Sequence, residues 1–340
     1  MSDEVVRRAE GNILYSLKLA EWLEGQPVEN RRVEVLPQGL EKLLEVNWDR
    51  IQGLQPELRK IVDEGLGILA AAREALPNSI LAEVAGWNEA RDQERFLKEA
   101  RTFLLEEPGL RGKEKAWRPF HESFRSFILE SKLDAQRERE LHRRLAQQLC
   151  QWPVIDTEER FRTSYVLRHG VTHWLKARQW EQARGLYTDL IYLEKRCQAA
   201  GVLSVEEALK MAATEVPEGE RKTAKDLHRA IQAGSHHLRV EPKRMASHVY
   251  NWLRCSAWTA ERLKSALSFS EGLPALRLRL PVRAGGSERT LEGHDHSVSC
   301  CAVTPDGRRV SSRSRRTGRS TPGRSRLRPA TTWSQTAPCF

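Results

Sequence analysis

The sequence lacks any long apolar run. No stretch of its 340 residues approaches the roughly 20 apolar residues that cross a bilayer as a helix. The first ten residues, MSDEVVRRAE, are charged and do not contain the apolar core of a secretion signal. With 39% hydrophobic and 30% charged residues, the composition is typical of a soluble globular chain, and the length allows two or three domains. These features predict a cytoplasmic protein.

Cysteine is sparse and unpatterned. The six cysteines are scattered and form no C-x-x-C pair, so neither a disulfide framework nor a zinc site is expected, and a reducing compartment is favoured. His236 and His237, with His228 or His248, could suggest a metal group. Zinc usually takes three or four convergent ligands, however, and we expect these histidines to mark a solvated helix end and no metal site.

Catalytic motifs are missing as well. The chain contains no phosphate-binding loop G-x-x-x-x-G-K-[ST], whose backbone N–H groups and lysine would hold phosphates, and no acidic strand end to hold magnesium. It also has no G-x-S-x-G nucleophile turn. We therefore expect no enzyme activity and no cofactor for the chain by itself.

Acidic residues are absent from residue 308 to the end, where nine arginines lie. Removing those nine from the 56 basic residues leaves 47, against 46 acidic residues, so the rest of the chain is nearly neutral despite a total net charge of +10. We expect residues 311–340 to be a disordered Arg/Ser-rich tail that contacts nucleic acid only non-specifically, through phosphates.

Apolar residues at helical spacing dominate what is present. Residues 3–24 form one such segment, and a second follows the turn at 36–39, with Leu40, Leu43, Leu44, Trp48 and Ile51 on one side. We assign 1–55 to a small helical subdomain.

Three further helical segments, at 57–73, 79–85 and 88–105, precede a hairpin-like stretch through the charged residues 111–118 and a helix over 120–131. Three helices followed by a small hairpin is the order of a winged-helix domain, which we place at 56–133. Its third helix carries Arg91, Arg95, Lys98 and Arg101, but also Glu89, Asp92, Glu94 and Glu99. Since a DNA-reading helix presents a net basic face, these mixed charges argue against DNA readout.

Residues 134–270 are nearly continuous helix. The clearest unit is a pair of helices, one containing Tyr165 and Trp174 and the other running from Trp180 to Leu193, joined by three residues. So short a loop predicts an antiparallel hairpin, and such hairpins stack into arms. We expect a helical arm over 134–270, followed by a linker and an incomplete β segment over 271–310.

Three motifs, taken in order, resemble signal-transduction ATPases of the NACHT and NB-ARC type with C-terminal WD repeats. The first is RAEGNILY at 8–15 with LPQGL at 36–40. The second is WRPFHESFRSF at 117–127, which is similar to the family's Met-His-Asp signature and the amphipathic helix after it. The third is LEGHDHSV at 291–298 with VTPDGRR at 303–309, which looks like the opening half of a WD repeat.

The resemblance implies a signalling switch that has lost its ATPase core and most of its WD propeller. In the family, the histidine equivalent to His121 contacts the β-phosphate of ADP, so His121 is the nucleotide-sensing candidate. The alternative is that His121 only caps the following helix or packs beside Phe120. The implied function is protein–protein contact, with protein partners and without a membrane, and nucleotide binds only with the missing core.

Two other functions stay open. The chain could be a nucleic-acid-binding regulator that uses the winged helix and the Arg-rich tail, or a truncated, frame-shifted remnant without function. Loss of polyanion binding on deletion of 308–340 would assign that binding to the tail alone.

We predict that the purified chain does not hydrolyse ATP or GTP, because phosphoryl transfer depends on positioned charge around the phosphates and the motifs that supply it are missing. A steady-state phosphate-release assay checks this. Magnesium-dependent turnover above a heat-inactivated control would contradict it.

Overall fold

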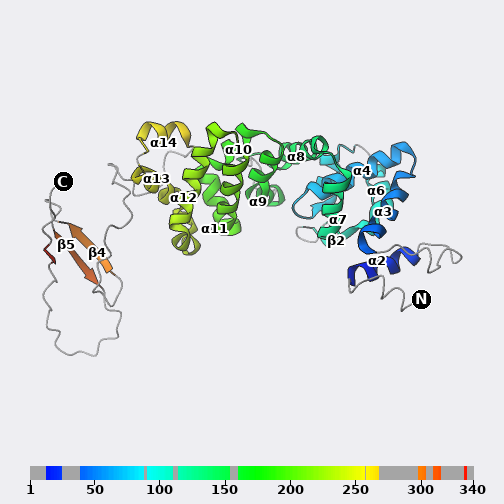
Figure 1. The fold of residues 1–340 in the computed structure, drawn as a ribbon, viewed down its shortest axis with the longest axis horizontal. Coiled ribbons are helices and arrows are strands. Elements are labelled where there is room, and N and C mark those ends of the chain that lie inside the picture. Colours follow the sequence, from blue (N-terminus) through cyan, green and yellow to red (C-terminus); the bar gives the residue numbers. More distant parts are fainter. Residues whose placement is uncertain are drawn as a thin grey trace, which may run out of the picture. The chain divides into compact units, whose positions relative to one another are not determined.

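The structure, a computed structural model, describes residues 13–24, 39–87, 90–109, 114–153, 160–256, 258–267, 298–303, 309–314 and 333–334. This part of the chain is mainly helical, as the sequence predicts, with small antiparallel sheets (Figure 1). It divides into two compact units, Met1–Ala284 and Gly285–Phe340, which we describe separately. No helix within the described ranges is long and apolar enough to cross a membrane.

The first two helices pack on each other around a small core. Helix α2 spans Ile13–Glu24 and α3 spans Gly39–Gln52. Tyr15 and Leu19 of α2 are fully buried against Leu43 of α3. The apolar side predicted for α3 is confirmed, since Leu43, Leu44, Trp48 and Ile51 are all buried. The predicted first part of the α2 helix, residues 3–12, lies outside the described residues.

The next segment combines three helices with a three-stranded sheet. Its elements are α4 (Pro56–Ala71), β1 (Leu76–Pro77), α5 (Asn78–Ala85), α6 (Ala90–Ala100), the 3-10 turn η3 (Arg101–Phe103), β2 (Leu104–Pro108) and β3 (Lys115–Pro119). The sheet has the order β1-β3-β2, and both pairings are antiparallel. Trp117, on the central strand, is buried and its indole N–H donates to Asn78 Oδ1 at 2.6 Å.

The third of these helices is shorter than the sequence predicts. Helix α6 ends at Ala100, whereas helical spacing suggested that it continued to residue 105. Leu104 and Leu105 instead pair with Pro119 and Arg118 of β3. Strand pairing with a partner distant in sequence therefore overrides the local helical pattern.

Helix α7 (Glu122–Phe127) follows β3 and continues as the π-helical turn η5 (Ile128–Lys132), so the predicted helix over 120–131 begins two residues late. Helix α8 (Ala135–Leu149) then packs on α4. Arg137 and Arg144 of α8 both donate to the Glu64 carboxylate of α4, and Arg144 also donates to the Val84 carbonyl. These bonds fix α8 against the preceding helices.

The remaining helices of the first unit form the region predicted as an arm. They are α9 (Arg160–Lys176), α10 (Trp180–Tyr187), α11 (Leu190–Glu215), α12 (Glu218–Val240), the 3-10 turn η6 (Pro242–Arg244), α13 (Met245–Cys255) and α14 (Ala260–Ala266). Helices α9 and α10 contact each other across residues 177–179, in agreement with the predicted hairpin. One buried cluster of side chains extends from α3 to the residue after α14.

The second helix of that hairpin is not continuous, contrary to the prediction that it runs from Trp180 to Leu193. Helix α10 ends at Tyr187, and α11 starts at Leu190. Asp189 lies between them and accepts hydrogen bonds from the N–H groups of Ile191 and Tyr192 at 2.8 and 3.2 Å. This N-cap begins a new helix at the break.

Helix α11 is itself kinked at Gly201, whose φ of 81° is in the region that favours glycine. The buried Arg196 lies beside the kink and donates to Ser204 O, on the far side of Gly201, and to Leu167 O in α9 at 3.0 Å. Arg196 therefore links the two halves of α11 to each other and to α9.

The second unit contains strands β4 (Val298–Val303), β5 (Arg309–Ser314) and β6 (Trp333–Ser334), in the antiparallel order β4-β5-β6. Strand β5 extends four residues into the region predicted to be a disordered tail, and β6 lies within that region. The pairing of β5 with β4 reaches Ser314, opposite Val298. Main-chain groups form this ladder, so a Ser/Arg-rich sequence does not prevent it. The predicted linker 271–290 and the other residues of the tail lie outside the described residues.

We predict that one of two glycine substitutions on α4 destabilises the fold and that the other leaves its stability nearly unchanged. In Gly65→Ala the new methyl would overlap the buried ring of Phe96 on α6, which costs about 1–3 kcal/mol of the free energy of unfolding. In Gly67→Ala the methyl would be 3.0 Å from the end of the Leu141 side chain, which can adjust. The gain in helix propensity, about 1 kcal/mol, then offsets the crowding.

Urea unfolding followed by circular dichroism measures both variants. A Gly65→Ala variant as stable as the parent would show that the α4–α6 contact at Gly65 is looser than the structure has it.

Candidate functional site

His121, the sequence's site candidate, lies at the junction between strand β3 and helix α7. It is the N-cap of α7, with extended backbone angles (φ −156°, ψ 155°), and its Nδ1 accepts a hydrogen bond from the Ser123 N–H at 3.1 Å. The ring is exposed. Because Nδ1 accepts, a neutral ring carries its proton on Nε2, which no described residue accepts. The capping role is therefore present, and one donor remains for another group.

A hollow of about 270 Å³ opens beside His121. It is lined by Ala72, Arg73, Glu74, Arg118, Pro119, His121, Glu122 and Arg125. Three arginines and two glutamates give the lining a net positive charge. Since the lining residues come from the segment after α4, from β3 and from α7, the fold brings together groups that are up to 53 positions apart in the sequence.

Two of the three arginines are neutralised. Arg125 donates to Glu122 Oε1 at 2.6 Å and to the Ala70 carbonyl at 2.7 Å, and Arg118 pairs with Glu107 at 2.5 Å. Arg73 forms no ion pair with any residue of the described ranges. Burial of part of its side chain lowers the pKa of the Arg73 guanidinium, and the charge of Arg125 lowers it further. An anion in the hollow would stabilise the charged guanidinium by attraction, so the hollow is suited to hold an anionic group.

The hollow is tied to the arm through Glu74. Its Oε2 accepts from Arg168 of α9 at 2.9 Å, while Oε1 lies 3.6 Å from His169 Nε2. Burial raises the pKa of the Glu74 carboxyl, and Arg168 opposes that rise. Arg73 and Glu74 both line the hollow, and Glu74 also forms an ion pair with Arg168 of α9.

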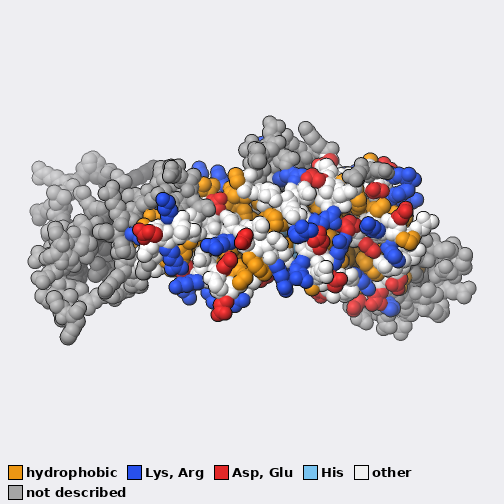
Figure 2. Space-filling model, turned by 90° about the horizontal axis from the view of Figure 1, so that it is seen from above, with side chains coloured by type: hydrophobic (Ala, Val, Ile, Leu, Met, Phe, Trp, Pro, Cys, Tyr) orange, Lys and Arg blue, Asp and Glu red, His pale blue; other side chains and the backbone are white. Residues whose placement is uncertain are grey.

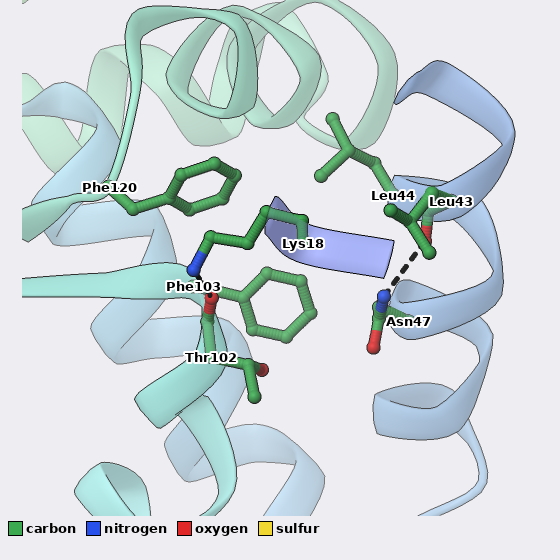
Figure 3. Close-up of a pocket in the computed structure, with 7 residues that line it drawn as sticks. All are labelled: Lys18, Leu43, Leu44, Asn47, Thr102, Phe103 and Phe120. Atoms are coloured by element: carbon green, nitrogen blue, oxygen red, sulfur yellow. Dashed lines mark hydrogen bonds between the residues drawn. The ribbon is translucent and has the colours of Figure 1, made fainter. Parts of the chain in front are cut away.

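Phe120, the residue before His121, is held from the opposite side by α2. Lys18 lies over the Phe120 ring, 4.4 Å from Nζ to the ring centre, and donates to the Thr102 carbonyl at 3.0 Å (Figure 3). The cavity between them and α3 measures about 20 Å³, which is room for about one water molecule. Helix α2 thus positions this segment and leaves no ligand site there.

A row of buried histidines lies behind Glu74. His142 Nδ1 is 2.8 Å from His173 Nδ1, and the Tyr165 hydroxyl is 2.9 Å from His173 Nε2. Burial lowers the pKa of His142 and of His169 to about 3, with smaller contributions from Arg73 and Arg196, respectively. Burial also lowers the pKa of His173, and His142 adds to that effect. At neutral pH these rings are uncharged, so neither the 3.8 Å approach of His142 Nε2 to Glu138 Oε1 nor that of His169 to Glu74 is an ion pair.

Other candidate sites from the sequence do not assemble. The cations of α6 are interspersed with acids: Arg95 lies 3.9 Å from Asp92, Arg101 lies 3.4 Å from Glu106, and Glu99 pairs with Arg50 of α3 at 3.2 Å. Figure 2 shows the same mixing of charges across the face it presents. His248 bonds to the Ala230 carbonyl at 2.8 Å, and among the described residues no cluster of His, Cys, Asp and Glu could hold a metal ion.

His121 could be found from the sequence, but the arginines around it were missed. Arg125 had a visible signal, because it lies four positions after His121 on the same helix. Arg73 and Arg118 had none, since their approach depends on the β1–β3 pairing and on the end of α4.

Comparison with known proteins assigns no family to the chain. No protein-family model matches the chain, and a search of the curated proteins finds no match.

We predict that stability falls as the pH drops from 7.5 to 5.5. The unfolded chain takes up protons on His142 and His169 near their ordinary pKa of 6.5, whereas the folded chain does so only near 3. Below pH 6.5 the unfolded state therefore binds more protons, and the stability that is present above that pH declines. Two such histidines cost about 2–3 kcal/mol at pH 5.5.

Urea unfolding at several pH values measures this decline. Replacing both residues, His142→Gln with His169→Gln, should make the pH dependence shallower and leave the part that comes from His173, whereas the exposed His237→Gln should leave the slope unchanged. A double variant with the pH slope of the parent chain would refute the assignment.

Proposed function

We propose that the chain is a non-catalytic regulatory and protein-interaction segment, which relays the state of a nucleotide-binding domain to a helical arm. This is the role implied by its resemblance to NACHT and NB-ARC signalling ATPases with WD repeats. One observation carries the proposal. His121 caps α7 through Nδ1 and offers Nε2 at the edge of a hollow lined by Arg73, which forms no ion pair with an acid of the described ranges.

The order of elements supports a winged-helix domain at 56–133. Helix α4, strand β1, helices α5 and α6, and strands β2 and β3 follow one another, and β3 lies between β1 and β2. In this proposal the loop between β2 and β3 is the wing, and α7 follows the wing. The charges of α6 cancel, so we assign the domain to contact with protein and not to DNA readout.

Contacts between this domain and the helices after it support the relay. Glu64 of α4 holds Arg137 and Arg144 of α8, and Glu74 holds Arg168 of α9. An anionic group bound at Arg73 would thus act one residue away from an ion pair with the arm. The arm itself is proposed to contact the protein partner.

Energetics set the limits of this site. A hydrogen bond to a charged group contributes about 1.5–3 kcal/mol, and millimolar affinity already requires about 4 kcal/mol. His121 and Arg73 together would therefore contribute about 3–6 kcal/mol, before the cost of immobilising the ligand, which corresponds to weak binding of a phosphate. A nucleotide would be held mainly by a separate nucleotide-binding domain, with His121 adding to its retention.

We predict that two His121 variants separate capping from nucleotide contact. His121→Ala removes both the cap and the ring donor, while His121→Ser keeps a capping oxygen and removes only the ring. In a fusion of this chain with a complete nucleotide-binding domain of the resembled family, both variants should bind ADP about tenfold more weakly than the parent, as measured by calorimetry.

Thermal unfolding of the same variants serves as the control. His121→Ala should lose about 0.5–2 kcal/mol of stability, and His121→Ser should recover most of it. Unchanged ADP affinity in His121→Ser would show that His121 acts only as a helix cap, and it would refute the proposal.

A further inference from the structure

Helix α12 presents a row of exposed basic and polar side chains that takes no part in the hollow at His121 or in the contacts between α4, α8 and α9. One face of the helix is buried against the arm through Ala224, Leu227, Ala230, Ile231, Gly234 and Leu238. Exposed side chains on another face follow each other at alternating intervals of three and four positions, which places them on one side of the helix. This basic row consists of Lys222, Lys225, Arg229, Gln232, His236 and Arg239.

The row has little acidic compensation after the first turn of α12, where the exposed Glu218 lies four positions before Lys222. Between residues 221 and 240 there are five Lys or Arg residues and one acid, Asp226. Asp226 is mostly buried, accepts from the Trp258 indole at 3.1 Å and lies 3.7 Å from Arg262, so it compensates the row little. Arg229 is 3.8 Å from it with a side chain that is 67% exposed. Lys222, Lys225 and Arg239 form no ion pair with any described residue. In α6, by contrast, the three cations are interspersed with three acids along the helix.

The side-chain types in the basic row limit the class of partner that it can bind. A helix that binds a membrane surface needs an apolar face, and a protein interface has a core that is poor in lysine and rich in aromatic and apolar side chains. The row offers neither, since Val240, at the last residue of α12, is the one large apolar side chain exposed on this helix. Its one aromatic ring is the imidazole of His236, and it contains no Phe, Tyr or Trp on which a single-stranded base could stack. Binding to duplex phosphates requires only cations, because released counterions drive it.

We propose that the basic row of α12 binds the phosphate backbone of a nucleic-acid duplex without recognising its sequence. From Lys222 to Arg239 the row extends over about 26 Å. A duplex carries one phosphate charge per about 1.7 Å of its axis, so about 15 phosphates lie within that length. Each cation finds a phosphate in any register. The site depends neither on the relay role of His121 nor on the arginines after residue 308.

The test uses the full chain and a fluorescent duplex of about 25 base pairs, with anisotropy measured between 50 and 200 mM salt. The row variant replaces Lys222, Lys225, Arg229 and Arg239 with Gln. A control variant removes the same charge elsewhere by replacing Lys60, Arg91, Lys98 and Arg184 with Gln. All eight side chains are exposed, and circular dichroism verifies that both variants stay folded. Arg91 and Lys98 also test α6 as a rival surface.

We expect the row variant to bind at least tenfold more weakly at 100 mM salt. The slope of log affinity against log salt should become shallower by about 3–4, at roughly 0.9 for each phosphate that the variant no longer neutralises. The control variant should stay within twofold of the parent. Binding that remains in the row variant is assigned to the arginines after residue 308, so the row is measured as a difference.

The proposal is overturned if the parent chain does not bind the duplex, if the row variant retains its affinity and slope, or if the control weakens as much. A second duplex of scrambled sequence should bind equally, and a preference above tenfold would contradict backbone recognition. Polyglutamate and phosphatidylserine vesicles are added as competitors. If either displaces the duplex from the parent at the same charge concentration, the partner class is wrong.

Discussion

The contact on which the first unit depends is the one between Glu64 and two arginines. The Glu64 carboxylate, only 14% exposed, receives Arg137 and Arg144 one on each oxygen. A carboxylate with so little exposure is favourable only when both oxygens are paired, because desolvation costs several kcal/mol otherwise. The two arginines lie seven positions apart on α8, so their joint contact sets both the rotation and the height of α8 on α4. The position of α9, and with it the partner of Glu74, follows from that placement.

Behind this contact, the interface continues with groups that stay neutral. His142 of α8 and His173 of α9 face each other, with Tyr165 completing the chain of hydrogen bonds. Neutral rings can fill a polar gap between helices without the cost of buried charge. Arg196 is the exception, a buried cation whose N–H groups bond to carbonyls and to the Tyr192 hydroxyl. Charge is thus concentrated at the edges of this interface, at Glu64 and Glu74, and near the kink of α11.

Helical spacing in the sequence was enough to find most helices, and local hydrogen bonds explain where it failed. The apolar side of α3 and the short loop between α9 and α10 follow directly from residue order. The break before α11 depends on the carboxylate of Asp189, and the early end of α6 depends on pairing between β2 and β3. Of the hollow, His121 and Arg125 were within reach of motif reasoning. Arg73 and Arg118 join it only through tertiary structure, which no spacing along the chain encodes.

Helices α6 and α12 show that the arrangement of charged side chains matters more than their number for attracting a polyanion. Helix α6 carries as many cations as acids, and Arg101, just after it, is also paired with an acid, so a polyanion meets no net field there. Helix α12 has its acids in the first turn and in the mostly buried Asp226, while four of its five cations lie on one exposed side. Since Coulomb attraction to a duplex adds over all phosphates within a Debye length of about 8–10 Å, aligned cations without acidic partners in the described ranges act together. The same reasoning applies at the hollow beside His121. Arg118 and Arg125 are each paired with an acid, whereas Arg73 forms no ion pair with a described residue. Arg73 therefore gives the hollow the net positive charge that a ligand would meet.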